Sequence, residues 1–95
     1  MLDRFVLNEL FDVYGELLTP RQQEILQLYV QEDLSYAEIS EELSISRSAV
    51  LDAVHKSISQ LEKYESVIQY LSKKKQLQDL VASDKELSKR VNEIF

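Results

Sequence analysis

Apolar side chains recur every three or four residues along most of the chain, which is the spacing of amphipathic α-helices. The first such pattern predicts a helix of about four turns, whose apolar positions are Leu2, Phe5, Val6, Leu10, Val13, Tyr14 and Leu17. A second helix is predicted from Thr19, because Thr19 and Gln22 have the spacing of a capping box and Pro20 suits the first helical position. Its apolar residues are Ile25, Leu26, Leu28, Tyr29 and Val30.

The stretch from Leu34 to Ser57 predicts two helices joined by a tight turn, the arrangement of a helix-turn-helix. Ser35 and Glu38 are spaced as a capping box that opens the first of these helices. Residues 44–46 interrupt the apolar pattern, and Ser46 is a suitable cap for the second helix. We expect the second helix to bury Val50, Val54 and Leu61 against Ile39, Leu43 and Ile45.

The second helix of this unit is predicted to be long. Its apolar positions continue at a spacing near 3.5 residues as far as Leu71, with no glycine or proline to interrupt them. Ser83 and Glu86 then predict another capping box, which opens a last helix. The apolar residues of that last helix are Leu87, Val91, Ile94 and Phe95.

These patterns predict an all-α fold. The chain has one glycine and one proline, so tight hairpin turns have little support. We expect residues 1–65 to form a helix-turn-helix domain and residues 66–95 to be a helical extension of the same domain.

The composition offers little for catalysis. There is no cysteine, the lone His55 has no evident nucleophile or ligand partner, and no glycine-rich phosphate loop occurs. We therefore expect no enzyme activity, no cofactor and no metal site. No apolar run approaches the roughly 18 residues of a membrane span, and the first ten residues lack the order of a secretory signal. The expectation is a cytoplasmic protein without membrane insertion.

Negative charge is concentrated in the first half of the chain. The net charge is −6, of which residues 1–43 contribute −8, residues 44–63 contribute +1 and residues 64–95 contribute +1. A value of +1 is far from the basic surface that neutralisation of nucleic-acid phosphates normally requires.

The outward face of the second helix of the helix-turn-helix supplies the candidate contact residues. With Val50 and Val54 inward, this face consists of Arg47, Ser48, Leu51, Asp52, His55 and Lys56. A helix that reads DNA normally presents Arg, Lys, Asn or Gln there. Arg47 fits that role and Ser48 can donate to phosphate or base, whereas the carboxylate of Asp52 repels the flanking phosphates. We therefore expect at most weak binding of duplex DNA, and a protein contact is an equal alternative.

A family resemblance can be placed on specific residues. It rests on Leu10-Phe11, Tyr14-Gly15 and Leu17-Leu18-Thr19 ahead of the helix-turn-helix, on Ser46-Arg47-Ser48-Ala49-Val50, Asp52 and Lys56 within it, and on Leu61, Glu62, Tyr64 and Glu65 after it. In these positions the chain resembles the small YlxM-type proteins. Residues 17–50 also resemble region 4 of the sigma-70 family, the domain that reads the promoter −35 element. The likeness covers roughly residues 8–65 well.

The resemblance implies a sigma-region-4-like helix-turn-helix bundle with a long recognition helix and a C-terminal helical extension. Because YlxM-type proteins are typically encoded beside the signal recognition particle GTPase or its receptor, it also implies a regulatory part in that protein-targeting pathway. The implied partners are the signal recognition particle (SRP) GTPase, its receptor or the SRP RNA.

Two other functions stay open from the sequence. The first is a DNA-binding transcription regulator that uses the helix starting at Ser46, with duplex DNA as its partner. The second is RNA binding through Lys73–Lys75. A helical homodimer is an even alternative to a monomer.

Overall fold

Side-chain caps fix where the first helices begin in the computed structural model, which describes residues 3–95. The Thr19 hydroxyl accepts from the Gln22 amide at 3.2 Å, and the Gln22 side-chain oxygen accepts from the Thr19 amide at 3.0 Å. Ser35 and Glu38 make the same reciprocal pair at 3.1 and 3.0 Å. The Ser46 hydroxyl accepts from the Ala49 amide at 3.1 Å. These hydrogen bonds confirm all three predicted caps. Each cap satisfies amides that the start of a helix leaves unpaired.

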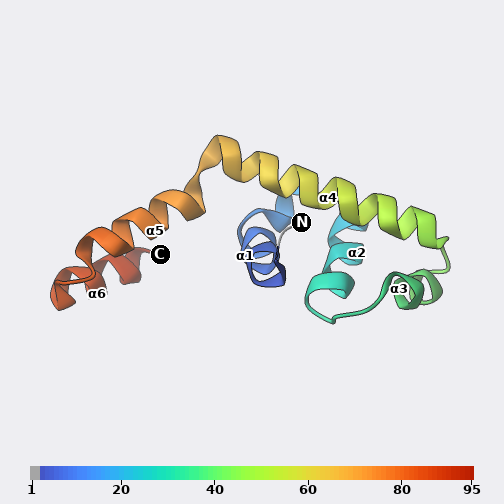
Figure 1. Cartoon of the computed structure of the whole chain (residues 1–95), viewed down its shortest axis with the longest axis horizontal. Coiled ribbons are helices and arrows are strands. Elements are labelled where there is room, and N and C mark those ends of the chain that lie inside the picture. The colour runs from blue at the N-terminus through green and yellow to red at the C-terminus, as the bar shows by residue number, and fades with distance from the viewer. Residues whose placement is uncertain (1–2) are drawn as a thin grey trace. The chain divides into compact units, whose positions relative to one another are not determined.

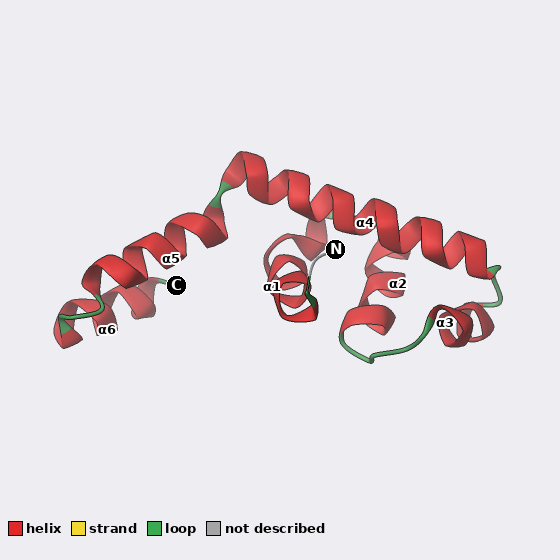
Figure 2. Cartoon of the chain, viewed as in Figure 1, coloured by secondary structure: helices red, strands yellow, loops and turns green. Residues whose placement is uncertain are grey.

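Every regular element in residues 3–95 is helical, which confirms the all-α prediction (Figure 2). The elements are α1 (Arg4–Tyr14), the short 3-10 helix η1 (Gly15–Leu17), α2 (Pro20–Val30), α3 (Tyr36–Leu43), α4 (Arg47–Ile68), α5 (Tyr70–Val81) and α6 (Lys85–Ile94). The chain divides into two units, Met1–Tyr64 and Glu65–Phe95. Whether the second unit is an extension of the same domain stays a prediction.

The turn between α3 and α4 is held by a serine of α3. Ser44 adopts the left-handed backbone conformation at φ 55°, which ends α3. The Ile45 amide donates to the Ser40 carbonyl at 3.1 Å, and the Ser40 hydroxyl donates to the Ile45 carbonyl. Ser40 therefore bonds both backbone groups of the middle turn residue, and this fixes the direction in which α4 leaves.

The core of the first unit lies where α1, α2 and α3 meet α4. Figure 1 shows these three helices gathered along one side of α4. The side chains of Leu26, Ile39, Val50, Val54 and Leu61 have no exposed surface. The predicted burial of Val50, Val54 and Leu61 is thus confirmed, whereas their predicted neighbours Leu43 and Ile45 are half-buried rather than buried.

The predicted inner face of α1 is largely wrong. Four of its members are exposed: Phe5 at 72%, Leu17 at 57%, Val13 at 38% and Val6 at 37%. The predicted positions Leu10 and Tyr14 are buried, and they are joined by Leu7 and Leu18, which were not predicted. The physical reason is that α1 carries two apolar stripes, and the core takes the stripe that includes Leu7. The predicted position Leu2 lies outside the described residues.

The long helix also ends earlier than predicted. α4 stops at Ile68 because Gln69 adopts the left-handed conformation at φ 57°. The Glu65 carboxylate then accepts from the amides of Leu71 at 3.1 Å and Ser72 at 3.0 Å, which caps α5 as a separate helix. Residues 69–71 contain no glycine or proline, so local composition gives no sign of this break.

The predicted capping box of Ser83 and Glu86 is wrong as well. Asp84 is the N-cap of α6, and its carboxylate accepts from the Leu87 amide at 3.1 Å. An aspartate is as good a cap as a serine, and here it stands one residue further along the chain. Neither α5 nor α6 contains a fully buried residue.

Candidate interaction face of the helix-turn-helix

The six predicted contact residues lie on one side of the first three turns of α4. Arg47, Ser48, Leu51, Asp52, His55 and Lys56 are all exposed. The helical period of 3.6 residues sets Ser48, Asp52 and His55 on successive turns of one face. Val50 and Val54 lie on the opposite face and are completely buried. The structure thus brings the six together as one surface, and their role in binding stays a prediction.

The charges on this face are few and partly cancelled. The Lys56 ammonium lies 3.3 Å from a carboxylate oxygen of Asp52, one turn earlier on α4. Both side chains are mostly exposed, at 69% and 64%, so solvent screens the attraction between them. Arg47 makes no ion pair with any residue in the range 3–95. Arg47 is therefore the one cation of this face without a neighbouring acid.

The start of α4 carries a small hydroxyl cluster. The hydroxyls of Ser46 and Ser48 lie 3.1 Å apart, while that of Ser46 also caps the helix through the Ala49 amide. Ser48 therefore keeps hydrogen-bonding capacity toward a partner. Beside it, Leu51 is 38% exposed, which adds an apolar contact to the polar ones.

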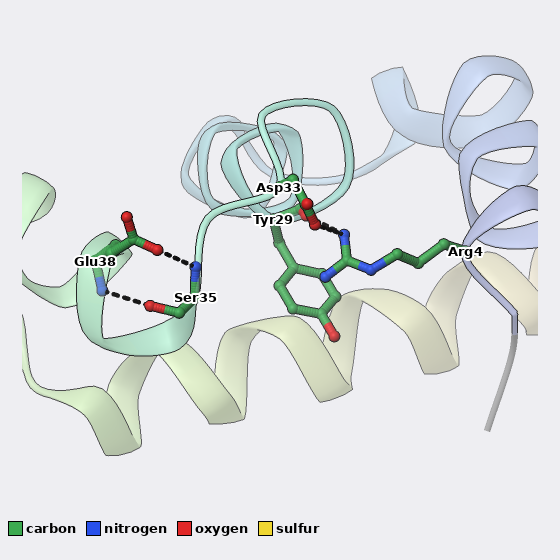
Figure 3. A network of polar contacts seen from close by, with 5 residues as sticks. All are labelled: Arg4, Tyr29, Asp33, Ser35 and Glu38. Atoms are coloured by element: carbon green, nitrogen blue, oxygen red, sulfur yellow. Dashed lines mark hydrogen bonds and ion pairs between the residues drawn. The ribbon is translucent and has the colours of Figure 1, made fainter.

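A second polar network lies at the junction of α1, α2 and α3 and escaped the sequence analysis. One guanidinium nitrogen of Arg4 donates to the Tyr29 carbonyl at 2.8 Å and pairs with the Asp33 carboxylate at 2.8 Å (Figure 3). The guanidinium carbon of Arg4 lies 4.6 Å from the centre of the Tyr29 ring, within the range of a cation–π interaction. Arg4 stands 25 residues before Tyr29, and no local spacing could have indicated this contact.

The network continues to the start of α3 through a pair of aromatic rings. The rings of Tyr29 and Tyr36 stack with their centres 5.4 Å apart. Partial burial raises the pKa of the Tyr36 hydroxyl, and the side-chain hydrogen bond with Tyr29 raises it further. Both effects favour the neutral form of the Tyr36 hydroxyl.

Glu38 lines the same pocket as these two tyrosines. Its hydrogen bonds from the backbone amide and then the side chain of Ser35 hold the pKa of Glu38 below its usual value. The charge of this carboxylate is thus committed to the cap of α3.

An open pocket of about 350 Å³ is lined by these groups, with Leu34 among them. Each charged side chain that lines it already has a partner inside the network: Arg4 pairs with Asp33, and Glu38 caps α3. The arrangement ties α1 to the loop after α2 and so positions α3, the first helix of the helix-turn-helix. We assign it a structural role.

Within residues 3–95, no three His, Cys, Asp or Glu side chains gather in a way that could hold a metal ion. None of the helices in this range has the length and apolar character needed to span a membrane.

Known proteins similar to this chain agree with the fold. The family described as "UPF0122: Putative helix-turn-helix protein, YlxM / p13 like" matches residues 1–94. Its relatives include the UPF0122 proteins of Bacillus thuringiensis (strain Al Hakam), Bacillus mycoides (strain KBAB4) and Bacillus anthracis (strain A0248). Each is 43% identical over 81 residues, which cover 85% of this chain and 74% of the relative. The resemblance drawn from Tyr14-Gly15 and residues 46–56 is thereby confirmed. The chain belongs to the UPF0122 family of YlxM / p13-like helix-turn-helix proteins.

Proposed function

We propose that this protein is a non-catalytic regulatory module of the SRP targeting pathway, and that it acts by binding a protein of that pathway through the outward face of α4. The candidate contacts are Arg47, Ser48, Leu51, Asp52, His55 and Lys56. The proposed partners are the SRP GTPase and its receptor. The proposal also places the protein in the cytoplasm, where that GTPase works.

The observation that carries the choice of a protein partner is the ion pair of Asp52 and Lys56 at the border of this face. A helix that enters the major groove brings its outward side chains between two phosphate strands. The Asp52 carboxylate would be repelled there, and it reduces the net positive charge that Lys56 contributes. A protein surface, in contrast, can pair with both members of the ion pair.

The amount of available positive charge supports the same choice. Arg47 and Lys56 are the two cations of the face, whereas specific DNA-binding proteins commonly make about 6–10 phosphate contacts. With two contacts, the slope of log K against log salt would be about −2 rather than about −5 to −9. Residues 1–64 carry twelve acids and five bases, a net charge of −7, which opposes the approach of any nucleic acid.

The choice of the SRP pathway rests on the resemblance to YlxM-type proteins and on the genomic setting typical of that family. The mixed face of α4 is compatible with it, because Leu51 gives an apolar centre and Arg47, Asp52 and Lys56 give a charged border. Protein interfaces commonly combine an apolar centre with a polar border.

A second candidate function is sequence-specific binding of duplex DNA by α4, as in a transcription regulator. The observation that favours it is the first turn of α4, where Arg47 is exposed next to Ser48 and has no ion-pair partner among residues 3–95. Arginine bound to guanine is the commonest base-specific contact. The likeness to sigma-70 region 4 supports this candidate as well.

RNA binding through Lys73–Lys75 has less support. The Lys74 ammonium lies 5.7 Å from the centre of the Phe95 ring, at the edge of cation–π range, so one of the three lysines is turned toward α6. Lys73 and Lys75 are exposed.

The experiment is affinity capture from cell lysate with the purified protein as bait, with and without RNase and DNase. We expect recovery of the SRP GTPase or its receptor that survives both nucleases. Asp52→Ala and Leu51→Ala should each reduce the recovery several-fold. Glu62→Ala, which removes an exposed acid on the same helix outside the face, should leave it unchanged. Loss of the captured protein after RNase would indicate the SRP RNA as the direct partner, and enrichment of a discrete DNA site would favour the second candidate.

A further inference from the structure

The second unit of the chain consists of helices that bury nothing completely. Neither α5 nor α6 has a fully buried side chain, and Leu80 and Ile94 are each 79% exposed. Leu87 is 46% exposed and Leu77 is 36% exposed. A helical hairpin gains its stability mainly from apolar burial, so this one has much of its stabilising surface uncovered.

The two helices run antiparallel and contact each other along one side. The Tyr70 ring at the start of α5 meets the Phe95 ring at the end of the chain, with centres 5.8 Å apart. Further along, the Gln78 side-chain amide donates to the Asn92 side-chain oxygen at 2.9 Å. The beginning of α5 therefore lies beside the end of α6.

The exposed apolar residues gather on one face of this hairpin. Each residue of a helix is rotated by 100° about the helix axis from the residue before it. Counted from the side of α5 that contacts α6, this rotation puts Leu77 and Leu80 on one flank of α5. Counted in the same way from the side of α6 that contacts α5, it puts Leu87 and Ile94 on the flank of α6 that is reached by turning in the same direction. Because the two helices point in opposite directions, flanks of the same sense lie on the same side of the hairpin. The four residues thus form one face, which we name the apolar flank.

The opposite face of the hairpin is polar. The same construction places Ser72, Lys75 and Asp79 of α5 there, together with Lys85 and Lys89 of α6. The contrast between the two faces resembles the surface of half of a four-helix bundle, in which one side of each helix pair is apolar and the other is solvated.

The exposure of the apolar flank favours a partner that covers it. Four large apolar side chains that share one face form a contiguous apolar surface, and such surfaces commonly mark sites of protein–protein contact.

The charge of the unit favours a second copy as the occupant. Residues 65–95 carry five acids and six bases, a net charge of +1, so two hairpins meet with little repulsion. Residues 1–64, at −7, would repel their own copy. A stable interface commonly needs about 800 Å² and 20–30 residues from each partner. The helices of one hairpin comprise 12 and 10 residues, so one face of it supplies fewer residues than this, and the interface belongs to the size class of weak, reversible complexes.

We propose that the protein is a homodimer in which the α5–α6 hairpins of two copies pack through the apolar flank. Leu77, Leu80, Leu87 and Ile94 of each copy are its centre, and the four helices form a bundle. Lys73 and Arg90 border the flank, and Glu86 and Glu93 lie at its outer edge. Acids and bases of equal number can therefore pair between the copies. The interface is isologous, with the same residues contributed by both chains.

The first test is the mass of the full chain in solution, measured by analytical ultracentrifugation over the micromolar range. The chain has a mass of 11.1 kDa, and we expect twice that value. The double substitution Leu80→Asp with Ile94→Asp should raise the dimer dissociation constant at least about 100-fold. Leu17→Asp, the same chemical change at an exposed leucine outside both the hairpin and the α4 face, should leave the constant unchanged. A wild-type monomer at all concentrations, or a dimer that is indifferent to the double substitution, would overturn the proposal.

A second test does not depend on the fold of the substituted hairpin. Since the chain has no cysteine, Lys73→Cys and Lys75→Cys each introduce a single thiol at an exposed lysine of α5. Lys73 borders the apolar flank and Lys75 lies on the polar face. A short bifunctional thiol reagent should link two chains of the Lys73→Cys variant and few of the Lys75→Cys variant. Equal linking of both, or preferential linking through Lys75→Cys, would contradict the assigned face.

Discussion

The central packing contact of the helix-turn-helix can be tested by placing a carboxylate at Val50. This side chain has no exposed surface, and neither has Ile39 of α3. The next residue of α4, Leu51, is 38% exposed on the outward side. The same change to aspartate at the two positions therefore differs only in whether the charge is buried.

The expected magnitude follows from burial. An unpaired carboxylate in an apolar site costs several kcal/mol, and loss of a buried valine removes about 1.5–3 kcal/mol more. At about 0.05–0.15 kcal/mol per residue, a unit of about 64 residues has a free energy of unfolding of about 3–10 kcal/mol. Val50→Asp thus removes most or all of the stability of the first unit. Leu51→Asp should cost about 1 kcal/mol or less, as surface substitutions usually do.

The assay is thermal unfolding followed by circular dichroism at the helical minimum, supported by urea titration. We expect Val50→Asp to lack the cooperative transition of the first unit and Leu51→Asp to keep it within a few degrees of wild type. Val50→Ala, a graded variant, should lower the midpoint without abolishing it. A cooperative transition of Val50→Asp at the wild-type midpoint would refute the assignment of Val50 to the core.

Three further predictions concern the polar contacts. Arg4→Ala should lower the free energy of unfolding by about 1 kcal/mol, since an exposed cation–π contact and a surface ion pair each contribute less than about 1 kcal/mol. Asp33→Asn should lower it less, because the contact of Arg4 with the Tyr29 ring remains. Equal midpoints for the two variants in thermal unfolding would contradict this. Asp84→Ala should destabilise α6 by about 1 kcal/mol, while Ser83→Ala should have little effect. Amide hydrogen exchange of α6 measures both, and faster exchange in Ser83→Ala than in Asp84→Ala would indicate Ser83 as the cap. The pKa of Glu38 is lowered in the folded state, so its carboxylate stabilises the fold at a pH above the unfolded-state pKa of about 4.3, and this contribution is lost as the pH falls through the folded-state pKa. The thermal midpoint of Glu38→Gln should therefore decline less than that of wild type between about pH 5 and pH 3. Parallel declines of the two midpoints would show that the shift is absent.

Local sequence chemistry predicted the starts of α2, α3 and α4 and the centre of the helix-turn-helix. The pairs Thr19–Gln22 and Ser35–Glu38 act over three residues, so their geometry is contained in the spacing itself. The inward positions of Val50 and Val54 followed from the helical period, because α4 has one apolar stripe in this region. The candidate contact residues are exposed for the same reason.

Two of the failures come from contacts between distant residues, and one comes from a local backbone conformation that the sequence does not mark. α1 has two apolar stripes, and the choice of the one with Leu7 depends on where α2 and α4 lie. The end of α4 depends on the left-handed Gln69 and on the Glu65 carboxylate that caps α5, although glutamine is not a residue that marks helix ends. The contacts of Arg4 join positions 25 and 29 residues apart, which no local pattern encodes.

The direct measurement for the proposed role of α4 is a set of binding titrations at about 0.15 M salt, where nonspecific DNA binding is typically weak at 10⁻⁴–10⁻⁶ M. Purified protein would be titrated against the SRP GTPase, its receptor, the SRP RNA and a pool of duplex DNA. The account predicts saturable binding to the GTPase or receptor that Asp52→Ala weakens, and duplex DNA binding that stays within the nonspecific range. Tight binding of one DNA sequence that Arg47→Ala abolishes, with no binding to either protein, would contradict it.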